Sequence, residues 1–314
     1  MDNLASIRDA FGRALVKLGE KNEKVVVLDA DVSTSTRTAF FHDKFPDRFF
    51  NFGVAEGNMM DAAAGLALVG KIPFVSTFSS LASLRALEQI RTSIAYPKLN
   101  VKIVGGYGGL SDFKDGPTHH SICDLAIIRS IPNMTLIVPA DAIETEKAVY
   151  AVAQYEGPVY LRLSRAEVPV IFDKNYKMEI GKGNLLKEGK DVTLIATGIM
   201  VARVLEAAKL LENKEKIDVR VIEIHTLKPI DVDIITQAAE ETGALVTAEE
   251  HSIIGGLAGA VAEVIVENNP VPMERVGIKD TFAESGEYNS LLEKYGMGLK
   301  NIIDAVKKVM KRKK

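Results

Sequence analysis

Short runs of apolar, often β-branched residues alternate with segments of helical periodicity along the whole chain. Such runs are typical of strands buried on both faces, which occur in parallel sheets covered by helices on each side. The first part of the chain is therefore predicted to be a doubly wound α/β domain with a mainly parallel sheet. Its expected strands are 25–31, 49–54, 72–78, 101–107, 135–140 and 159–164, and its expected helices include 55–69, 84–96 and 143–154.

The alternation stops after residue 165 and returns near residue 191. The segment 166–190 is rich in lysine and glycine and is interpreted as a linker or an edge excursion. The sequence thus predicts a first domain at 1–165 and a second, smaller α/β domain at 191–314. The expected strands of the second domain are 191–197, 219–224, 244–250 and 274–280.

The composition fits two globular domains and excludes several classes of protein. Of 314 residues, 47% are hydrophobic and 26% are charged, and the net charge is -3. This balance is ordinary for a folded chain, and it provides no broad basic field for nucleic acid. The basic end at 307–314 is expected to be a solvated helix terminus. Cys123 is the single cysteine, which excludes an intrachain disulfide and cysteine-based zinc sites.

The N-terminal segment and the lengths of the apolar runs predict the cellular location of the chain. Residues 1–20 include Asp2 and Asp9 and contain no apolar core segment, so a signal peptide is not expected. No uncharged apolar run approaches the ~20 residues needed to cross a bilayer. We therefore expect a cytoplasmic chain without membrane contact.

Several common site motifs are absent. The glycines at 105, 106, 108 and 109 do not complete a dinucleotide fingerprint, because Ser111 takes the last position. The chain has no phosphate-binding P-loop, no H-E-x-x-H and no G-x-S-x-G motif. Another chemistry must therefore account for the polar residues that follow the predicted strands.

Glu56 opens the helical segment GVAEGNMMDAAAGLAL, whose other residues are almost all small or apolar. A glutamate in a first turn can simply favour the positive end of the helix dipole. A buried carboxylic acid can instead keep its proton and act as a donor. The residues alone leave both interpretations open, and the apolar helix predicts burial, perhaps against another chain.

The segment KDGPTHHS places His119 and His120 directly after an Asp-Gly-Pro turn. Turn chemistry alone explains Asp115, Gly116 and Pro117. Ligands of open α/β sheets bind at the carboxyl ends of the strands, where histidine can move protons near neutral pH. These two histidines therefore favour a functional role.

Arginines follow the strand at 159–164 in the segment LRLSRAE. Arg162 and Arg165 can each be an ordinary solvated arginine, or an anion clamp at the carboxyl edge of the sheet. His42, His225 and His251 belong to no such segment and are expected to be structural.

The three segments, in this order, resemble the pyrimidine-binding domain of transketolases. The segment VTAEEHSIIGGLAGAVAEVI resembles their C-terminal domain, so the likeness covers essentially the whole chain. The GDG motif with which transketolases hold the diphosphate of thiamine diphosphate is absent. The resemblance therefore implies a half-enzyme and a partner, an N-terminal subunit with the GDG motif that holds Mg²⁺ or Ca²⁺. It assigns no metal ligand to this chain and implies a homodimer core within a heterotetramer.

The resemblance also implies roles for individual residues. Glu56 matches the acid that protonates the pyrimidine ring of the cofactor, and His119 matches a residue that shuttles protons during cleavage. Cofactor contacts are implied for Asp31, Glu56, Phe78, Leu81 and Leu84, where the two leucines replace aromatic residues of the family. Substrate contacts are implied for Arg8, Ser35, Tyr107, Asp115, His119 and Arg165, where Tyr107 replaces a phosphate-binding histidine.

The implied reaction is reversible transfer of a two-carbon ketol unit between sugar phosphates, from xylulose 5-phosphate to ribose 5-phosphate. Two rivals use the same cofactor: the beta chain of the first component of a 2-oxo acid dehydrogenase, and a deoxyxylulose-phosphate-synthase-like half. The DGPTHH segment argues against the first, and the usual single long chain of the synthase argues against the second. A rival of another class is a non-catalytic subunit that binds or regulates.

Overall fold

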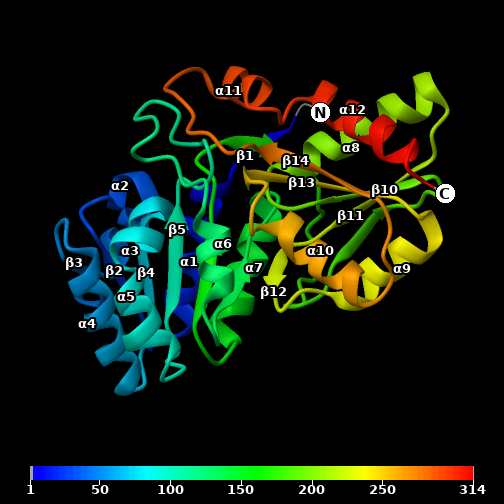
Figure 1. Ribbon diagram of the computed structural model, residues 1–314. Helices are drawn as coiled ribbons and strands as arrows, with labels where there is room; N and C mark the ends of the chain where they lie inside the picture. The colour runs from blue at the N-terminus through cyan, green and yellow to red at the C-terminus, as the bar shows by residue number, and fades with distance from the viewer. Residues whose placement is uncertain (1–2, 314) are drawn as a thin grey trace.

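The computed structural model describes residues 3–313 and forms two lobes, each built on one sheet (Figure 1). Met1, Asp2 and Lys314, which belong to the predicted terminal segments, lie outside the described residues. We call the unit around the seven-stranded sheet the first lobe and the unit around the five-stranded sheet the second lobe. Among the described residues, no helix combines the length and the apolar character needed to cross a membrane.

The sheet of the first lobe has the strand order β12-β6-β7-β5-β4-β2-β3. All neighbours are parallel except β12, which pairs antiparallel with β6 at the edge. The prediction of a mainly parallel, doubly wound sheet is confirmed. The strands are β2 (Val25–Asp29), β3 (Phe49–Asn51), β4 (Ile72–Phe78), β5 (Lys102–Gly106), β6 (Thr135–Ile137), β7 (Val159–Arg162) and β12 (Thr226–Lys228).

Strand β2 shows why the strands of this sheet are apolar at every position. Val25 and Val27 point into the core that contains Phe11, whereas Val26 and Leu28 point into the opposite core that contains Met59. Successive side chains of a strand face opposite sides of the sheet, so both faces must be covered. The helices of this lobe are α1 (Ile7–Lys21), α2 (Ser33–Thr36), α3 (Ala39–Lys44), η1 (Pro46–Arg48), α4 (Glu56–Leu68), α6 (Asp124–Ser130) and α7 (Ala142–Gln154).

The predicted helix at 84–96 is less regular than its sequence pattern indicates. Short α5 (Leu87–Gln89) lies between two wide π-helical turns, η2 (Leu81–Arg85) and η3 (Ile90–Ala95). The Ser83 hydroxyl donates to the carbonyl of Ser79 at 2.7 Å and thus bonds the start of this segment to its preceding turn. Side chains that bond the backbone in this way often bend helices, and π-turns are frequent near functional sites.

The second lobe has the strand order β14-β13-β10-β11-β9, parallel except for the edge strand β9. Its apolar core continues into that of the first lobe, since Val27 and Val201 belong to one connected cluster. Its strands are β9 (Asn184–Lys187), β10 (Val192–Ala196), β11 (Val219–Glu223), β13 (Leu245–Ser252) and β14 (Met273–Ile278). Its helices are α8 (Met200–Leu210), η4 (Leu211–Glu215), α9 (Val232–Thr242), α10 (Leu257–Glu267), α11 (Tyr288–Lys294) and α12 (Leu299–Met310).

The segment 166–190, predicted as a linker or an edge excursion, contains two short strands. Strand β8 (Glu167–Pro169) pairs with β1 (Leu4–Ser6) near the N-terminus. Strand β9 adds an antiparallel edge to the second sheet. Strand β12, which belongs to the second part of the chain, pairs with β6 at the edge of the first sheet. The two lobes are therefore joined by β12 as well as by a continuous core.

Candidate active site

The predicted site residues gather at the carboxyl edge of the first sheet. Asp31 follows β2, Phe78 ends β4 and Tyr107 follows β5, and these three strands are neighbours. Parallel strands bring their carboxyl ends to one edge, which is where open α/β sheets bind ligands. Asp31 and Tyr107 have φ angles of 65° and 60°. This uncommon left-handed conformation turns the chain sharply where each strand ends.

Two arginines and two aromatic rings form the centre of the site. The Phe78 and Tyr107 ring centroids are 4.6 Å apart, and the His119 ring lies 6.0 Å from Phe78, edge to face. Arg8 donates from Nη1 to the Tyr107 hydroxyl at 2.8 Å and to the Ser35 carbonyl at 3.1 Å. Nη2 of Arg8 forms none of the described hydrogen bonds, so the guanidinium keeps donor capacity for a ligand.

Arg165 lies over the Tyr107 ring at 5.1 Å and over the Phe113 ring at 5.0 Å, a cation–π arrangement that fixes its plane. It also donates to Asp112 Oδ1 at 3.3 Å. Asp112 is fully buried. Burial first, and then the neighbouring Asp115, raise the pKa of Asp112 to about 6. Arg165 is therefore held by groups that sequence reasoning missed: Asp112 and Phe113 belong to no recognised motif.

The Asp-Gly-Pro turn forms as predicted. Gly116 has a φ of 80°, and its carbonyl accepts from the backbone N–H groups of His119 and His120 at 2.9 and 3.0 Å. Asp115 is exposed and His119 half-buried, and Nδ1 of His119 is 3.0 Å from the Thr118 hydroxyl. His120 is buried, neither ring nitrogen has a described partner, and burial lowers its pKa. The turn thus presents Asp115 and His119 together and holds His120 beneath them.

Glu56 begins α4 and is buried at 1% side-chain exposure. Both of its carboxylate oxygens accept from Arg85 Nη1, at 3.1 and 2.9 Å. The Arg85 side chain is 51% exposed and can turn away without losing other described hydrogen bonds. Sequence reasoning did not consider Arg85, which lies one residue after the predicted contact Leu84. A ligand nitrogen reaches Glu56 only after Arg85 moves aside.

Glu56 and the predicted leucines belong to other elements than the arginine cluster, α4 and η2. Leu84 is exposed and Leu81 half-buried. Asp31 is exposed and exchanges hydrogen bonds with Asn51 at the end of β3. The first lobe also presents several apolar side chains to solvent. They are Phe50, Val54, Leu68, Val69, Leu84 and Tyr96.

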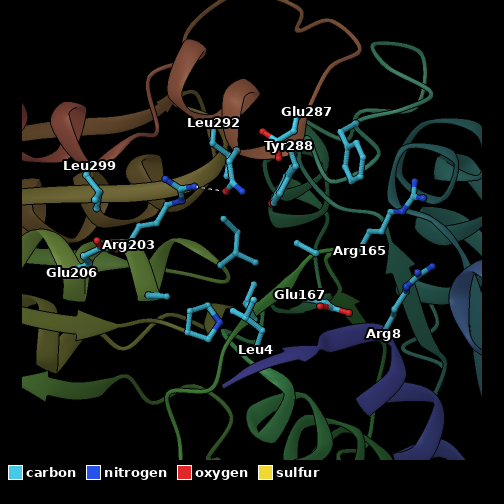
Figure 2. Close-up of a pocket in the computed structure, with 17 residues that line it drawn as sticks. Leu4, Arg8, Arg165, Glu167, Arg203, Glu206, Glu287, Tyr288, Leu292 and Leu299 are labelled. Carbon is cyan, nitrogen blue, oxygen red and sulfur yellow. Dashed lines mark hydrogen bonds between the residues drawn. The ribbon is translucent and has the colours of Figure 1, made fainter. Parts of the chain in front are cut away.

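A cavity of about 520 Å³ lies between the lobes (Figure 2). Figure 2 shows Arg8 and Arg165 on one side of the cavity and Arg203 and Glu206 on the other. Tyr288 of α11 lies at its edge. Both predicted anion-binding arginines line this space, and Figure 2 shows their guanidinium ends directed away from the opposite wall. The cavity is large enough for a sugar phosphate, and the second lobe supplies part of its wall.

The buried position of Arg162 contradicts one hypothesis drawn from the sequence. Its side chain is 5% exposed, and Nε donates to Asp124 Oδ2 at 2.8 Å. Its Nη2 group donates to the carbonyls of Ser121 and Glu250, at 3.0 Å each. The hypothesis that Arg162 is an anion clamp is wrong, because buried carboxylate and carbonyl groups already occupy the guanidinium. Arg162 instead joins the lobes.

Glu250 of the second lobe accepts hydrogen bonds at Oε1 from the Leu110 N–H at 2.8 Å and from the Tyr288 hydroxyl at 2.9 Å. Burial raises the pKa of Glu250 to about 7. The folded state thus binds a proton more tightly than the unfolded state, whose glutamate pKa is about 4.3. The contribution of Glu250 to stability therefore falls as pH rises from about 4 to about 7.

We expect Glu250→Gln to remove this pH dependence, because glutamine still offers a carbonyl oxygen to Leu110 and Tyr288. Between pH 5 and pH 7.5, the variant should gain roughly 2–3 kcal/mol of unfolding free energy relative to the unmodified chain. Urea unfolding at the two pH values measures this change. Glu284→Gln, at an exposed glutamate, is the matched control. Equal pH dependence in both variants contradicts the prediction.

Two family models match the chain: the transketolase pyrimidine-binding domain over residues 4–170 and the transketolase C-terminal domain over residues 181–302. The chain belongs to the transketolase family. It is 46% identical over 309 residues to a putative transketolase C-terminal section from Methanocaldococcus jannaschii, covering 98% of this chain and 96% of that one. The α/β fold and the family resemblance predicted from the sequence are confirmed.

Two further relatives of this transketolase chain refine the comparison. One is a 6-deoxy-6-sulfo-D-fructose transketolase subunit from Clostridium sp., 43% identical, with 98% of this chain and 95% of that one covered. The other is a solved structure described as a split gene transketolase, an inactive β4 tetramer. It has a TM-score of 0.91 and 51% identity, with 99% and 100% of the two chains covered. This transketolase chain corresponds to the C-terminal section of a split enzyme.

Membership of the family implies thiamine diphosphate, and the residues present fit its pyrimidine end. Glu56 is a buried carboxylate whose described side-chain partner is a half-exposed arginine. The Phe78 ring and the Leu81 side chain are partly buried and offer apolar surface to a flat ring. These groups match an aminopyrimidine, which carries both a polar edge and apolar faces.

Proposed function

We propose that this chain is the C-terminal subunit of a two-chain transketolase that transfers a ketol unit from xylulose 5-phosphate to ribose 5-phosphate. The observation that carries the proposal is the convergence of Arg8, Arg165 and His119 around Tyr107 at the edge of the interlobe cavity. Two cations suit the anionic end of a phosphorylated sugar. A half-buried histidine beside them suits proton transfer at a hydroxyl group.

Each residue then has a defined task. Arg165, held in plane by Tyr107 and Phe113, and Arg8 bind the terminal anion. Asp115 accepts hydrogen bonds from sugar hydroxyls, and His119 removes and returns the hydroxyl proton during carbon–carbon cleavage. Glu56 holds the proton on the pyrimidine edge of the cofactor. Thiamine diphosphate, when bound, supplies the electron sink for this cleavage.

The partner is proposed to be an N-terminal subunit with a GDG motif, which holds the diphosphate group and Mg²⁺ or Ca²⁺. Val54, Leu68 and Val69, at 69–74% exposure, lie beside the two ends of α4, the helix that Glu56 begins, and are apolar surface of the kind that other chains cover. We propose a homodimer core within a heterotetramer. The solved relative described as inactive when tetrameric by itself supports the need for a second chain.

Reconstitution tests the proposal directly. Ketol transfer is measured with this chain alone, with a GDG-bearing chain of the same genome alone, and with the mixture. The assay contains thiamine diphosphate, Mg²⁺, xylulose 5-phosphate and ribose 5-phosphate. Activity in the mixture only is the expected result. A stable complex that transfers no ketol unit overturns this substrate assignment.

The same assay is repeated with a sulfonated donor, because one relative is described as a 6-deoxy-6-sulfo-D-fructose transketolase subunit. An arginine pair binds a sulfonate as well as a phosphate. If the complex uses only the sulfonated ketose, the proposed substrate class is wrong, whereas the proposed reaction, ketol transfer, stands. A complex that turns over 2-oxo acids or forms deoxyxylulose phosphate supports the rival thiamine enzymes instead.

Arg165→Ala should raise KM for the phosphorylated donor about 10–100-fold with a smaller change in kcat. The reason is that a hydrogen bond to a charged group contributes about 1.5–3 kcal/mol, and the lost contact lies at the non-reacting end of the substrate. Steady-state kinetics of the reconstituted complex measure both constants. Arg275→Ala, at an exposed arginine of the second lobe, serves as control. A loss confined to kcat contradicts anion binding by Arg165.

A further inference from the structure

Two glutamates and a histidine meet between the lobes, away from the cluster around Tyr107. Glu144 comes from α7 of the first lobe, Glu223 ends β11 of the second lobe, and His225 follows two residues later. Each offers one ligand atom, and these atoms all lie within 4.8 Å of one another. All three side chains are buried, with exposures of 0–1%. Neither the family resemblance nor the proposed reaction uses these residues.

In their ionised form, the two carboxylates carry negative charge that no basic side chain among the described residues balances. Within residues 3–313, neither Glu144 nor Glu223 forms a salt bridge with lysine or arginine. The acidic neighbour Asp141, which caps α7, adds to the negative potential. A buried charge without a counter-charge is strongly unfavourable. The site therefore requires a cation or bound protons.

The hydrogen bonds of the cluster leave one ligand position open. Glu144 accepts from the Tyr176 hydroxyl at Oε1 and from the Ala140 N–H at Oε2, both at 2.6 Å. Glu223 accepts at Oε2 from Asn184 Nδ2 at 2.7 Å. The second oxygen of Glu223, Oε1, is buried and has no partner among the described residues. Buried polar atoms are rarely left unpaired in native proteins, so this oxygen indicates a missing ligand.

One ring nitrogen of the histidine has a hydrogen-bond partner. Nδ1 of His225 lies 2.7 Å from the Thr226 hydroxyl. If Nδ1 donates its proton there, Nε2 presents a lone pair. Ligating histidines characteristically use one ring nitrogen for the metal and bond the other to a neighbouring group. The hydrogen bonds to Glu144 and Glu223 orient those carboxylates in the same manner.

We infer that Glu144, Glu223 and His225 bind a divalent transition-metal cation that joins the two lobes. Two carboxylates neutralise a divalent ion, which makes the buried site uncharged. One imidazole with two carboxylates suits Zn²⁺, Co²⁺ or Mn²⁺, whereas Mg²⁺ and Ca²⁺ prefer oxygen ligands alone. Bond lengths near 2.1 Å place neighbouring ligand atoms about 3–4 Å apart, so a small inward movement of side chains completes the site. This ion is distinct from the metal of the cofactor.

Metal content of the tag-free chain tests the inference. The chain is stripped with a chelator, dialysed against Co²⁺, Zn²⁺ or Mn²⁺ alone at pH 7.5, and analysed for metal by mass spectrometry. We expect about one equivalent per chain for at least one ion, and a rise in Tm of about 5 °C at saturating metal. For Co²⁺ we also expect visible absorption bands from a protein-bound ion. Binding below 0.1 equivalent by a folded chain, for all three metals, overturns the inference.

Variants locate the site. Glu223→Gln and His225→Gln should each lower metal affinity at least tenfold, since ligand or orienting groups are lost. Glu249→Gln, at another buried glutamate, which pairs with His251 and caps α10, should bind metal like the unmodified chain. Equal binding by all variants overturns the assignment to this cluster. A folded, metal-free chain that Glu223→Gln stabilises would show that the glutamates share a proton instead, and this also overturns the inference.

Discussion

Glu56→Gln should lower ketol transfer by the reconstituted complex by about 10²–10⁴-fold, the usual contribution of a general acid or base. Glutamine keeps the size of the side chain and one oxygen that accepts from Arg85, so the start of α4 should remain folded. It has no exchangeable carboxyl proton to place on the cofactor. The loss should appear in kcat, while association of the two chains is unchanged. Steady-state kinetics and analytical ultracentrifugation measure these two quantities.

Asp61→Asn is the matched control, because Asp61 lies on the same helix and is exposed. Its carboxylate accepts from the Ser93 hydroxyl, which asparagine can retain. This variant should keep near-normal activity. If Glu56→Gln leaves transfer intact in a proven complex, then Glu56 is not the proton donor. The interpretation of this chain as a non-catalytic subunit then gains support.

Asp124→Ala should destabilise the chain by about 3–5 kcal/mol, which is the typical effect of removing one partner of a buried ion pair. Asp124 is fully buried and accepts from Arg162 at 2.8 Å. Alanine leaves the Arg162 charge in the interior without its counter-charge. Arg162 also donates to carbonyls of both lobes, so we expect the interlobe contact to weaken together with the fold. Urea unfolding monitored by circular dichroism measures the change.

The double variant Asp124→Leu/Arg162→Met separates charge from packing. Replacing a buried ion pair by apolar residues of similar volume is often neutral or stabilising. The double variant should therefore recover part of the stability that Asp124→Ala loses, because methionine does not donate to the Ser121 and Glu250 carbonyls. A change below 1 kcal/mol for Asp124→Ala contradicts the prediction, because the guanidinium would then have found other compensation.

The strands of both sheets could be predicted from the sequence because parallel sheets bury both faces. The valines of β2 divide between two cores, and this requires an uninterrupted apolar run that is visible in the sequence. The Asp-Gly-Pro turn could also be predicted, since a φ of 80° at residue 116 is a local requirement that glycine meets. Local backbone preferences and burial on both faces are properties that a linear sequence records.

The partners of charged side chains could not be predicted. Arg162 and Arg165 stand three residues apart in the same segment, and only the family resemblance favoured Arg165 as the substrate contact. Arg162 is hydrogen-bonded to buried Asp124. Arg165 instead lies against the Tyr107 and Phe113 rings and lines the cavity. Likewise Arg85 was not foreseen as the partner of Glu56. Such pairings depend on approach of distant segments, for which hydrophobic periodicity carries no signal.

The sequence by itself determined the α/β class, the order of most strands and helices, and the segments that mark the transketolase family. The tertiary structure alone decided which lobe contributes β12 and β9 to which sheet. It also decided which arginine is free to bind an anion and that Glu144, Glu223 and His225 meet. The physical reason is that burial patterns repeat every two or 3.6 residues and so act locally. Charge compensation instead depends on distances of a few ångströms between residues far apart in the chain.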